Sequence, residues 1–254
     1  MSTPPGCDGR ALPLQVTLPN DPNFWQILAV FYGYVPWVIC LFIGLAFLVY
    51  RGSRKLAVGL LPALTAGINE LVKLGVNQSR PLGSCLTSKG MPSSHSAVSI
   101  GLFLYLILDA GYRIKPSGSG IFGSCKSVGD TSVKMLKGAL VLPFGSMTLK
   151  EFFGYGALWA VLLLPVPVAR VLLNDHSPSQ AMAGMLVGML AAFLWFPLML
   201  FMRSSWRNHV GRKYLYIFVH NYDVPEGWGE EGSQAETDPI VPKQKSEDTS
   251  ANIV

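Results

Sequence analysis

Charged residues are scarce in this chain of 254 residues: Asp, Glu, Lys and Arg make up 14% of it, against 50% hydrophobic residues. The scarcity is uneven, because residues 24–50 and 181–202 carry no charge at all. Three further windows, 56–76, 93–110 and 152–172, are almost as apolar. A membrane-spanning helix needs about 20 apolar residues, and this many apolar runs in one short chain argue against a soluble globular protein.

Cysteine is also rare, and its pattern predicts little. Cys7, Cys40, Cys85 and Cys125 have neither a paired spacing nor a metal-ligand spacing, so neither a disulfide framework nor a zinc site is indicated. A cleavable signal peptide is not expected either, because the first apolar run begins more than twenty residues into the chain and is too long for a signal sequence.

These patterns predict an all-α fold: a polytopic bundle of about five membrane-spanning helices. We expect residues 1–23 to be a polar leader, flexible or interfacial, residues 24–203 to form the membrane domain, and residues 204–254 to be a cytosolic tail, disordered from about residue 226. The stretch Val133–Lys150 mixes apolar residues with lysines, which makes it a candidate for an additional helix along the membrane surface.

Five spans place alternate loops on opposite sides of the bilayer, and the basic residues divide unequally between these sides. One side holds few of them: Arg10, Lys73, Arg80, Lys89 and Arg170. The other side holds most of them: Arg51, Arg54, Lys55, Arg113, Lys115, Lys126, Lys134, Lys137, Lys150, Arg203, Arg207, Arg212, Lys213, Lys243 and Lys245. The positive-inside rule puts the richer side, with the C-terminus, in the cytosol. Anionic lipid, rather than nucleic acid, explains this basic surface.

Three short polar segments lie at the ends of apolar runs. They are Lys73-x6-Arg80-Pro81, Pro92-Ser93-Ser94-His95 and Arg170-x5-His176. The first two share one loop, and the third emerges on the same side after two further spans. All three can therefore meet at one membrane face, the lumenal or extracellular one.

The residue types in these segments are those that a phosphoryl-transfer site without a metal ion requires. Lys73, Arg80 and Arg170 supply fixed positive charge for phosphate oxygens, and Lys73 and Arg80 lie on one side of a helix if that helix continues to Arg80. Two further features are expected at helix starts: Ser93 as an N-cap, and Ser177-Pro178 as an N-cap followed by proline. Such helix starts bind phosphate, and His95 and His176, which lie beside them, can carry protons.

Each segment alone has an ordinary structural explanation. Single basic residues at a membrane edge are usually interfacial anchors, and Pro-Ser-Ser-His is usually a helix cap. The combination on one face favours a site. Asn69 and Glu70, polar residues within the second span, are expected to face the bundle interior beside it, whereas His209 and His220 are expected at the surface.

The three segments together resemble the signature of the type 2 phosphatidic acid phosphatase superfamily, over about residues 69–180. The resemblance implies that His176 attacks phosphorus and that His95 is the acid and base. It also implies that Lys73, Arg80, Ser93, Ser94 and Arg170 hold the phosphoryl group, without metal or cofactor.

Two positions depart from the family pattern. Ala169 stands where a serine is usual, and Gln180 stands where an aspartate usually orients the nucleophilic histidine. We expect the Gln180 carbonyl to accept the ring N–H instead, although Ser177-x-x-Gln180 also fits a capping box. With Gly90–Ser96, this glutamine resembles the dolichyl diphosphate phosphatase branch of the family. That likeness implies hydrolysis of a polyprenyl diphosphate to the monophosphate in the endoplasmic reticulum membrane, which recycles the lipid carrier of protein N-glycosylation.

Two alternatives remain open at this stage. A broader lipid phosphatase would act on phosphatidate or sphingoid phosphates, although the missing aspartate argues mildly against alkoxide leaving groups. A non-catalytic protein could use the cations to bind lipid phosphates, although binding alone does not require paired histidines. Haloperoxidase activity is disfavoured because those family members are soluble. Prenyl chain length and oligomeric state are not determined by the sequence.

Overall fold

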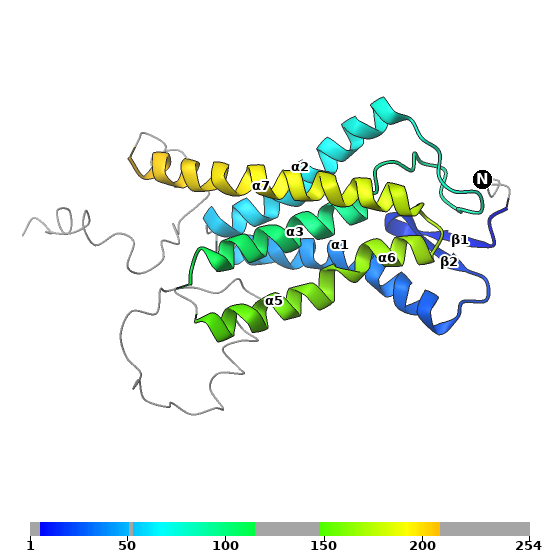
Figure 1. Ribbon diagram of the computed structural model, residues 1–254, viewed down its shortest axis with the longest axis horizontal. Coiled ribbons are helices and arrows are strands. Elements are labelled where there is room, and N and C mark those ends of the chain that lie inside the picture. Colours follow the sequence, from blue (N-terminus) through cyan, green and yellow to red (C-terminus); the bar gives the residue numbers. More distant parts are fainter. Residues whose placement is uncertain (1–5, 51–52, 115–147, 209–254) are drawn as a thin grey trace, which may run out of the picture.

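The computed structural model describes residues 6–50, 53–114 and 148–208, and it is a helical bundle (Figure 1). Five candidate membrane spans lie within these residues, which confirms the predicted fold class. The helices are α1 (Phe24–Tyr50), α2 (Ser53–Val76), α3 (Ser94–Gly111), α5 (Leu149–Leu163), α6 (Pro165–Leu172) and α7 (Pro178–Asn208).

The fourth span consists of two helices, α5 and α6, in place of the single helix expected over 152–172. Pro165 begins α6, and because proline has no backbone N–H it suits the first position of a helix better than the interior. Leu164 between them keeps a right-handed helical conformation, so α5 and α6 still cross the membrane region as one span of 24 residues.

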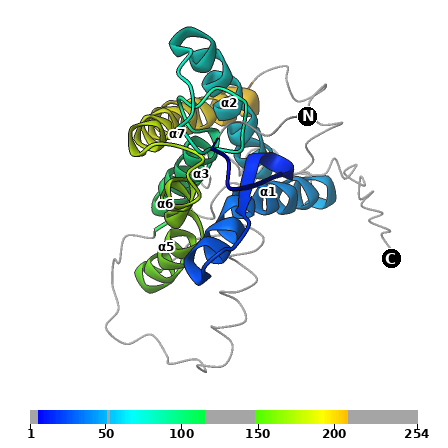
Figure 2. The same ribbon diagram turned by 90° about the vertical axis from the view of Figure 1, so that its right-hand side faces the viewer.

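Helix α3 lies at the centre of the bundle, in contact with each of the other spanning helices (Figure 2). Its closest approach is to α7, where glycines replace side chains. A Cβ atom on Gly184 would lie 2.3 Å from the Ser93 carbonyl oxygen, and one on Gly188 would lie 2.1 Å from the Ala97 carbonyl oxygen. This small-residue spacing lets two membrane helices pack backbone to backbone. The starts of α3 and α7 are thereby held side by side.

The leader contains a folded β-hairpin, so the expectation of a flexible segment is wrong for Gly9–Pro19. Strands β1 (Gly9–Leu12) and β2 (Val16–Pro19) are antiparallel and are joined by the 3-10 turn Pro13–Gln15. Val16 is fully buried, in a small apolar cluster with Ala29 of α1 and Ala169 of α6. The hairpin is held in place because this burial removes an apolar side chain from water.

A disulfide joins Cys7, just before the hairpin, to Cys85 in the loop between α2 and α3. The two Cα atoms are 4.9 Å apart although the residues are separated by 78 positions. The spacing of the cysteines along the sequence does not predict this bond, because only the packing of the hairpin against the loop brings Cys7 and Cys85 together. Cys40, in α1, is a free thiol.

We predict that reducing this disulfide lowers the free energy of unfolding by about 2–5 kcal/mol, since it removes the cross-link that restricts the unfolded chain. Thermal unfolding in detergent, with and without a reductant, measures the change. Cys40→Ser is the matched control and should show the same drop as the wild type. A Cys7→Ser protein that still responds to the reductant would contradict the assignment.

Several predictions concern residues that are not described. The candidate surface helix Val133–Lys150 lies outside the described residues except for its end, where Thr148 caps α5 and Leu149 and Lys150 belong to that helix. The proposed cytosolic tail also lies outside them from residue 209 onward. Helix α7 continues to Asn208, a little beyond the expected limit of the membrane domain at residue 203.

Candidate active site

The three sequence segments meet at the end of the bundle that carries the hairpin (Figures 1 and 2). Helices α2 and α6 end there, and helices α3 and α7 begin there. Both ending helices are followed by an asparagine in the left-handed conformation, Asn77 (φ 49°) and Asn174 (φ 56°), which is a common way to stop a helix. After Asn174 the chain turns back, and the amides of Asp175 and His176 donate to the carbonyl of Arg170. This turn explains why five residues separate Arg170 from His176.

The start of α3 confirms Ser93 as the N-cap. Its side chain accepts from the Ser96 amide and also contacts the Ser96 hydroxyl at 3.0 Å, while its own amide donates to the Gln180 carbonyl. Ser93 thus caps α3 and joins it to α7. Both bonds to its hydroxyl use the oxygen as an acceptor, so the O–H can still donate to a phosphoryl oxygen, the role that the resemblance implies.

Ser94 is held by polar residues of α2. Lys73 Nζ lies 2.8 Å from the Ser94 hydroxyl and 2.7 Å from Glu70, and Asn69 donates to the same hydroxyl at 2.7 Å. Asn69 is fully buried, as expected. The Glu70 side chain is 64% exposed, so it contacts Lys73 from the rim and does not face the interior.

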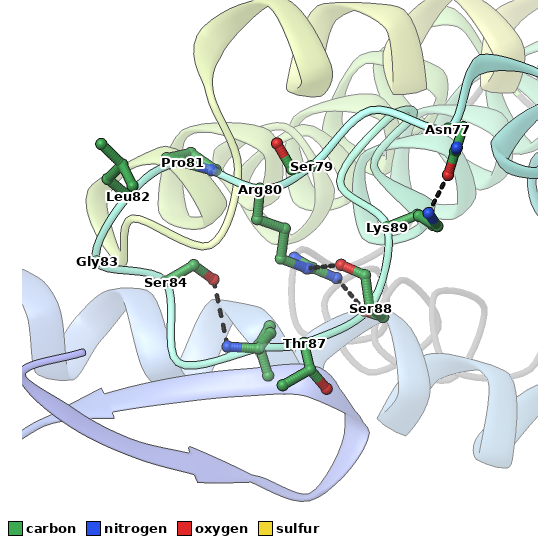
Figure 3. Close-up of a pocket in the computed structure, with 11 residues that line it drawn as sticks. Asn77, Ser79, Arg80, Pro81, Leu82, Gly83, Ser84, Thr87, Ser88 and Lys89 are labelled. Atoms are coloured by element: carbon green, nitrogen blue, oxygen red, sulfur yellow. Dashed lines mark hydrogen bonds between the residues drawn. The ribbon is translucent and has the colours of Figure 1, made fainter. Parts of the chain in front are cut away.

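Arg80 reaches the site from a loop, because α2 ends at Val76 and does not continue to it. Ser88 fixes the side chain: Arg80 Nε donates to its carbonyl at 2.9 Å and Nη2 to its hydroxyl at 2.8 Å (Figure 3). The loop around these residues encloses a cavity of about 320 Å³. Burial lowers the pKa of Arg80 to about 10, so the guanidinium remains charged at neutral pH.

Arg170 is fully buried, and only one of its three guanidinium nitrogens has acceptors among the described residues. Nη2 lies 2.9 Å from Asp175 Oδ2, and Asp175 also accepts from the hydroxyl of Thr17 in β2. Arg170 Nε and Nη1, however, have no hydrogen-bond partner among the described residues. Buried donors without acceptors are costly, and the oxygens of a bound phosphoryl group would satisfy them.

The hydrogen bonds of His176 determine which of its ring nitrogens carries the proton. Nε2 lies 3.1 Å from Arg80 Nη1, and because an arginine only donates, Nε2 must be the acceptor. Nδ1 lies 2.8 Å from the Gly90 carbonyl oxygen, so Nδ1 carries the proton. Burial, together with Arg80 and Arg170, lowers the pKa of His176 to about 2. The ring is neutral, with a lone pair on Nε2.

Gln180 does not orient His176, contrary to the expectation from the sequence. Its carbonyl oxygen accepts from the Ser177 amide, and the Ser177 hydroxyl accepts from the Gln180 amide, which completes the capping box. Its Nε2 donates to the Ser79 carbonyl at 2.7 Å. The side chain instead packs against Gly90, where an added Cβ would lie 2.6 Å from Gln180 Nε2. Gln180 therefore positions the loop whose carbonyl orients His176.

His95 has a hydrogen-bond partner that sequence reasoning missed. Trp37 of α1 donates its Nε1–H to His95 Nε2 at 3.0 Å. Indole is only a donor, so Nε2 accepts and Nδ1 carries the proton. The backbone of Leu14, at the tip of the hairpin, is a further partner of the ring. Nothing in the first apolar run distinguishes Trp37 from a lipid-facing aromatic residue before the helices are packed.

The comparisons with known proteins agree with this geometry. The family description "PAP2 superfamily" matches residues 54–204, more than half of the chain. The chain belongs to the PAP2 superfamily. Comparison with curated proteins and with solved structures gives no match. Membership in this superfamily indicates phosphatase activity on lipid phosphates, and five apolar helices make this member a multi-pass membrane protein.

The match to the PAP2 superfamily begins at Arg54 and so excludes the hairpin and α1. Both nevertheless contact the site: Trp37 holds His95, and Thr17 holds Asp175. Ala169, at the position where the family usually has serine, is buried in the apolar cluster beneath the hairpin. This PAP2 site is thus completed by elements at the N-terminal side of the family region.

The low pKa of His176 predicts a loss of stability in acid. An unfolded histidine takes up a proton below about pH 6.5, whereas folded His176 remains neutral down to about pH 2. The contribution of His176 to the free energy of unfolding is therefore complete above pH 6.5. It decreases as the pH falls below 6.5, by up to about 1.4 kcal/mol per pH unit. Unfolding midpoints at pH 7 and pH 5 test this, and His176→Gln should show the smaller decrease. Equal decreases in the two proteins would refute it.

Proposed function

We propose that this phosphatase hydrolyses a polyprenyl diphosphate, such as dolichyl diphosphate, to the monophosphate and inorganic phosphate through a phosphohistidine on His176. The observation that carries the proposal is the environment of His176 Nε2. This unprotonated nitrogen lies 3.1 Å from Arg80, in a site where buried Arg170 still has two donors without acceptors. Such a site combines a nucleophile with positive charge for phosphate oxygens.

The reaction follows from these positions. His176 Nε2 attacks the terminal phosphorus, the bond from phosphorus to the bridging oxygen breaks, and the polyprenyl monophosphate leaves. Water gives a proton to His95 Nε2, in place of the Trp37 N–H, and attacks the phosphorus of the phosphohistidine. The N–P bond breaks, and His95 returns the proton to the departing phosphate. Arg80 and Arg170 bind the phosphoryl oxygens throughout, with Lys73 and Ser94 at the adjacent helix start. These cations supply the charge that a metal ion supplies elsewhere.

The partner of His176 Nδ1 supports a diphosphate substrate. The Gly90 carbonyl fixes the tautomer, but it has no charge with which to stabilise an imidazolium as an aspartate would. A phosphate leaving group needs less assistance than an alkoxide. The site is therefore better suited to a diphosphate than to a phosphate monoester such as phosphatidate.

Two observations support a lumenal site in the endoplasmic reticulum membrane. Alternation of the five spans assigns most of the basic residues in the sequence to the side opposite the site. The Cys7–Cys85 disulfide lies on the face that carries the site, and disulfides persist in oxidising compartments rather than in the cytosol. Dolichyl diphosphate is released at the lumenal face of the membrane, so the substrate and the site would lie on the same side.

The test compares phosphate release from dolichyl diphosphate, dolichyl monophosphate and phosphatidate by purified protein in detergent with excess EDTA. We expect the diphosphate to be hydrolysed with the highest kcat/KM. Equal rates on phosphatidate would indicate a broad lipid phosphatase. A protein that binds the lipids and hydrolyses none would be a binding protein, and either result would overturn the proposal.

The hydrogen bond from Trp37 predicts a role in positioning His95. Trp37→Phe keeps an aromatic ring and removes the N–H donor, so His95 loses the bond that fixes its tautomer. A net loss of about 1 kcal/mol corresponds to a decrease in kcat of about fivefold to tenfold, with KM nearly unchanged. Trp25→Phe, in the same helix with a 64% exposed side chain, is the matched control. Equal kcat values in both variants would refute this role.

A further inference from the structure

The tip of the N-terminal hairpin lies on the proposed phosphoryl site and contacts one residue of each sequence segment. The carbonyl oxygen of Gln15 accepts from Arg170 Nη2. The side-chain Oε1 of the same residue accepts from Arg80 Nη2 at 3.2 Å. The backbone of the preceding residue, Leu14, is a partner of His95. One residue thus places two oxygens on the two guanidinium groups of the site.

These oxygens occupy one donor on each arginine, Nη2, beside the Nε and Nη1 donors of Arg170 that have no acceptor among the described residues. Phosphate binds arginine through pairs of N–H···O bonds, and Nη2 of both arginines is engaged by Gln15. The site residues are also closed off, since His95, Arg170 and His176 are at most 3% exposed. A phosphoryl group that takes the Nη2 donors must displace the oxygens of Gln15.

The tip is strained, while the rest of the hairpin is anchored. Leu14 and Gln15 have positive φ values of 61° and 59°, a conformation that is unfavourable for residues other than glycine. On either side of the tip, the Cys7–Cys85 disulfide and the bond from Thr17 to Asp175 hold the strands. Displacement of the tip would relieve this backbone conformation without detaching the hairpin.

We propose that Gln15 is a built-in competitor of the substrate phosphoryl group and thereby sets the affinity of the site for phosphate. The inference rests on the proposed function, because it takes Arg80 and Arg170 as the phosphoryl ligands. In the empty site Gln15 supplies acceptors to the buried guanidinium of Arg170 and to the partly buried guanidinium of Arg80. When a phosphoryl group binds, its oxygens replace the oxygens of Gln15, and the tip moves away.

Two substitutions with opposite expected effects test this in the full-length protein in detergent. The dissociation constant of inorganic phosphate is measured from the shift of the unfolding midpoint over a concentration series. Gln15→Ala removes the acceptor for Arg80, so phosphate should bind about tenfold more tightly. Gln15→Glu places a carboxylate on Arg80, so phosphate should bind about tenfold more weakly. Asn20→Ala, at an exposed residue directly after β2 and outside the tip, is the control and should bind like the wild type.

The outcomes separate this inference from the proposed function. Tighter phosphate binding in Gln15→Ala together with weaker binding in Gln15→Glu would support Gln15 as a competitor of phosphate. Phosphate affinities that are equal in all variants would overturn it and leave the phosphoryl site intact, as would weaker binding in Gln15→Ala, which would make Gln15 a ligand of phosphate. An absence of phosphate binding in every protein, wild type included, would overturn the phosphoryl site itself.

Discussion

Replacing His176 with alanine should reduce phosphate release from dolichyl diphosphate by at least about 10⁴-fold, since removal of a nucleophile eliminates the covalent route. The ring is neutral, because burial and the neighbouring arginines lower its pKa to about 2. Its Nε2 is also the nitrogen beside Arg80. Arginine and lysine side chains remain in the variant, so phosphate should still bind. Rates at saturating substrate and phosphate-induced stabilisation are the two measurements.

Ser179→Ala is the matched control for this variant. Ser179 lies three residues from His176 at the start of α7 and is exposed, and its hydroxyl contacts Ser177. We expect its activity to remain within about twofold of the wild type, as for most surface substitutions. A His176→Ala protein with substantial activity would mean that another group attacks phosphorus.

Arg170→Gln should be both inactive and unstable. The substitution leaves Asp175 as a fully buried carboxylate without its guanidinium partner, and breaking one side of a buried ion pair costs about 3–5 kcal/mol. It also removes a fork that binds phosphoryl oxygens. Denaturant titration and the rate of phosphate release measure the two effects separately.

The double variant Arg170→Gln/Asp175→Asn distinguishes stability from catalysis. Removing both charges eliminates the unpaired carboxylate, so the double variant should be more stable than Arg170→Gln. The interaction free energy between the two substitutions in a double-mutant cycle should be at least about 1 kcal/mol. Its activity should remain lost, because the phosphoryl ligand is still absent. Recovery of activity together with stability would show that Arg170 only supports the fold.

The spans and the meeting of the three segments could be predicted from the sequence, because both depend on features that a linear pattern contains. Long apolar runs determine the number of spans, and alternation of sides determines which segments share a face. The caps at Ser93 and Ser177 were predicted for the same reason, since capping depends on residues within one helical turn. These predictions needed no knowledge of packing.

The parts that could not be predicted depend on contacts between residues far apart in the chain. Gln180 was expected to orient His176 by analogy of position, but a backbone carbonyl, that of Gly90, performs this task. Side-chain patterns do not reveal which carbonyl faces a ring. Trp37 and Gln15 reach the site from elements that precede the family region, and their role appears only after α1 and the hairpin are packed.

The Cys7–Cys85 bond illustrates the same limit. A short polar leader rich in proline is typical of a flexible segment, and four scattered cysteines suggest no pairing. Burial of Val16 against α1 and α6 is what turns this leader into a hairpin and brings Cys7 to the loop. The hairpin and the disulfide are thus products of tertiary packing.

The most direct test of the central claim is to trap the phosphorylated enzyme. Protein incubated with dolichyl diphosphate in excess EDTA is quenched in alkali, in which phosphohistidine survives, and the modified residue is located by mass spectrometry. Our account predicts phosphate on His176, and none on His95 or in the His176→Ala protein. Phosphate on another residue, or turnover without any phosphorylated protein, would contradict it.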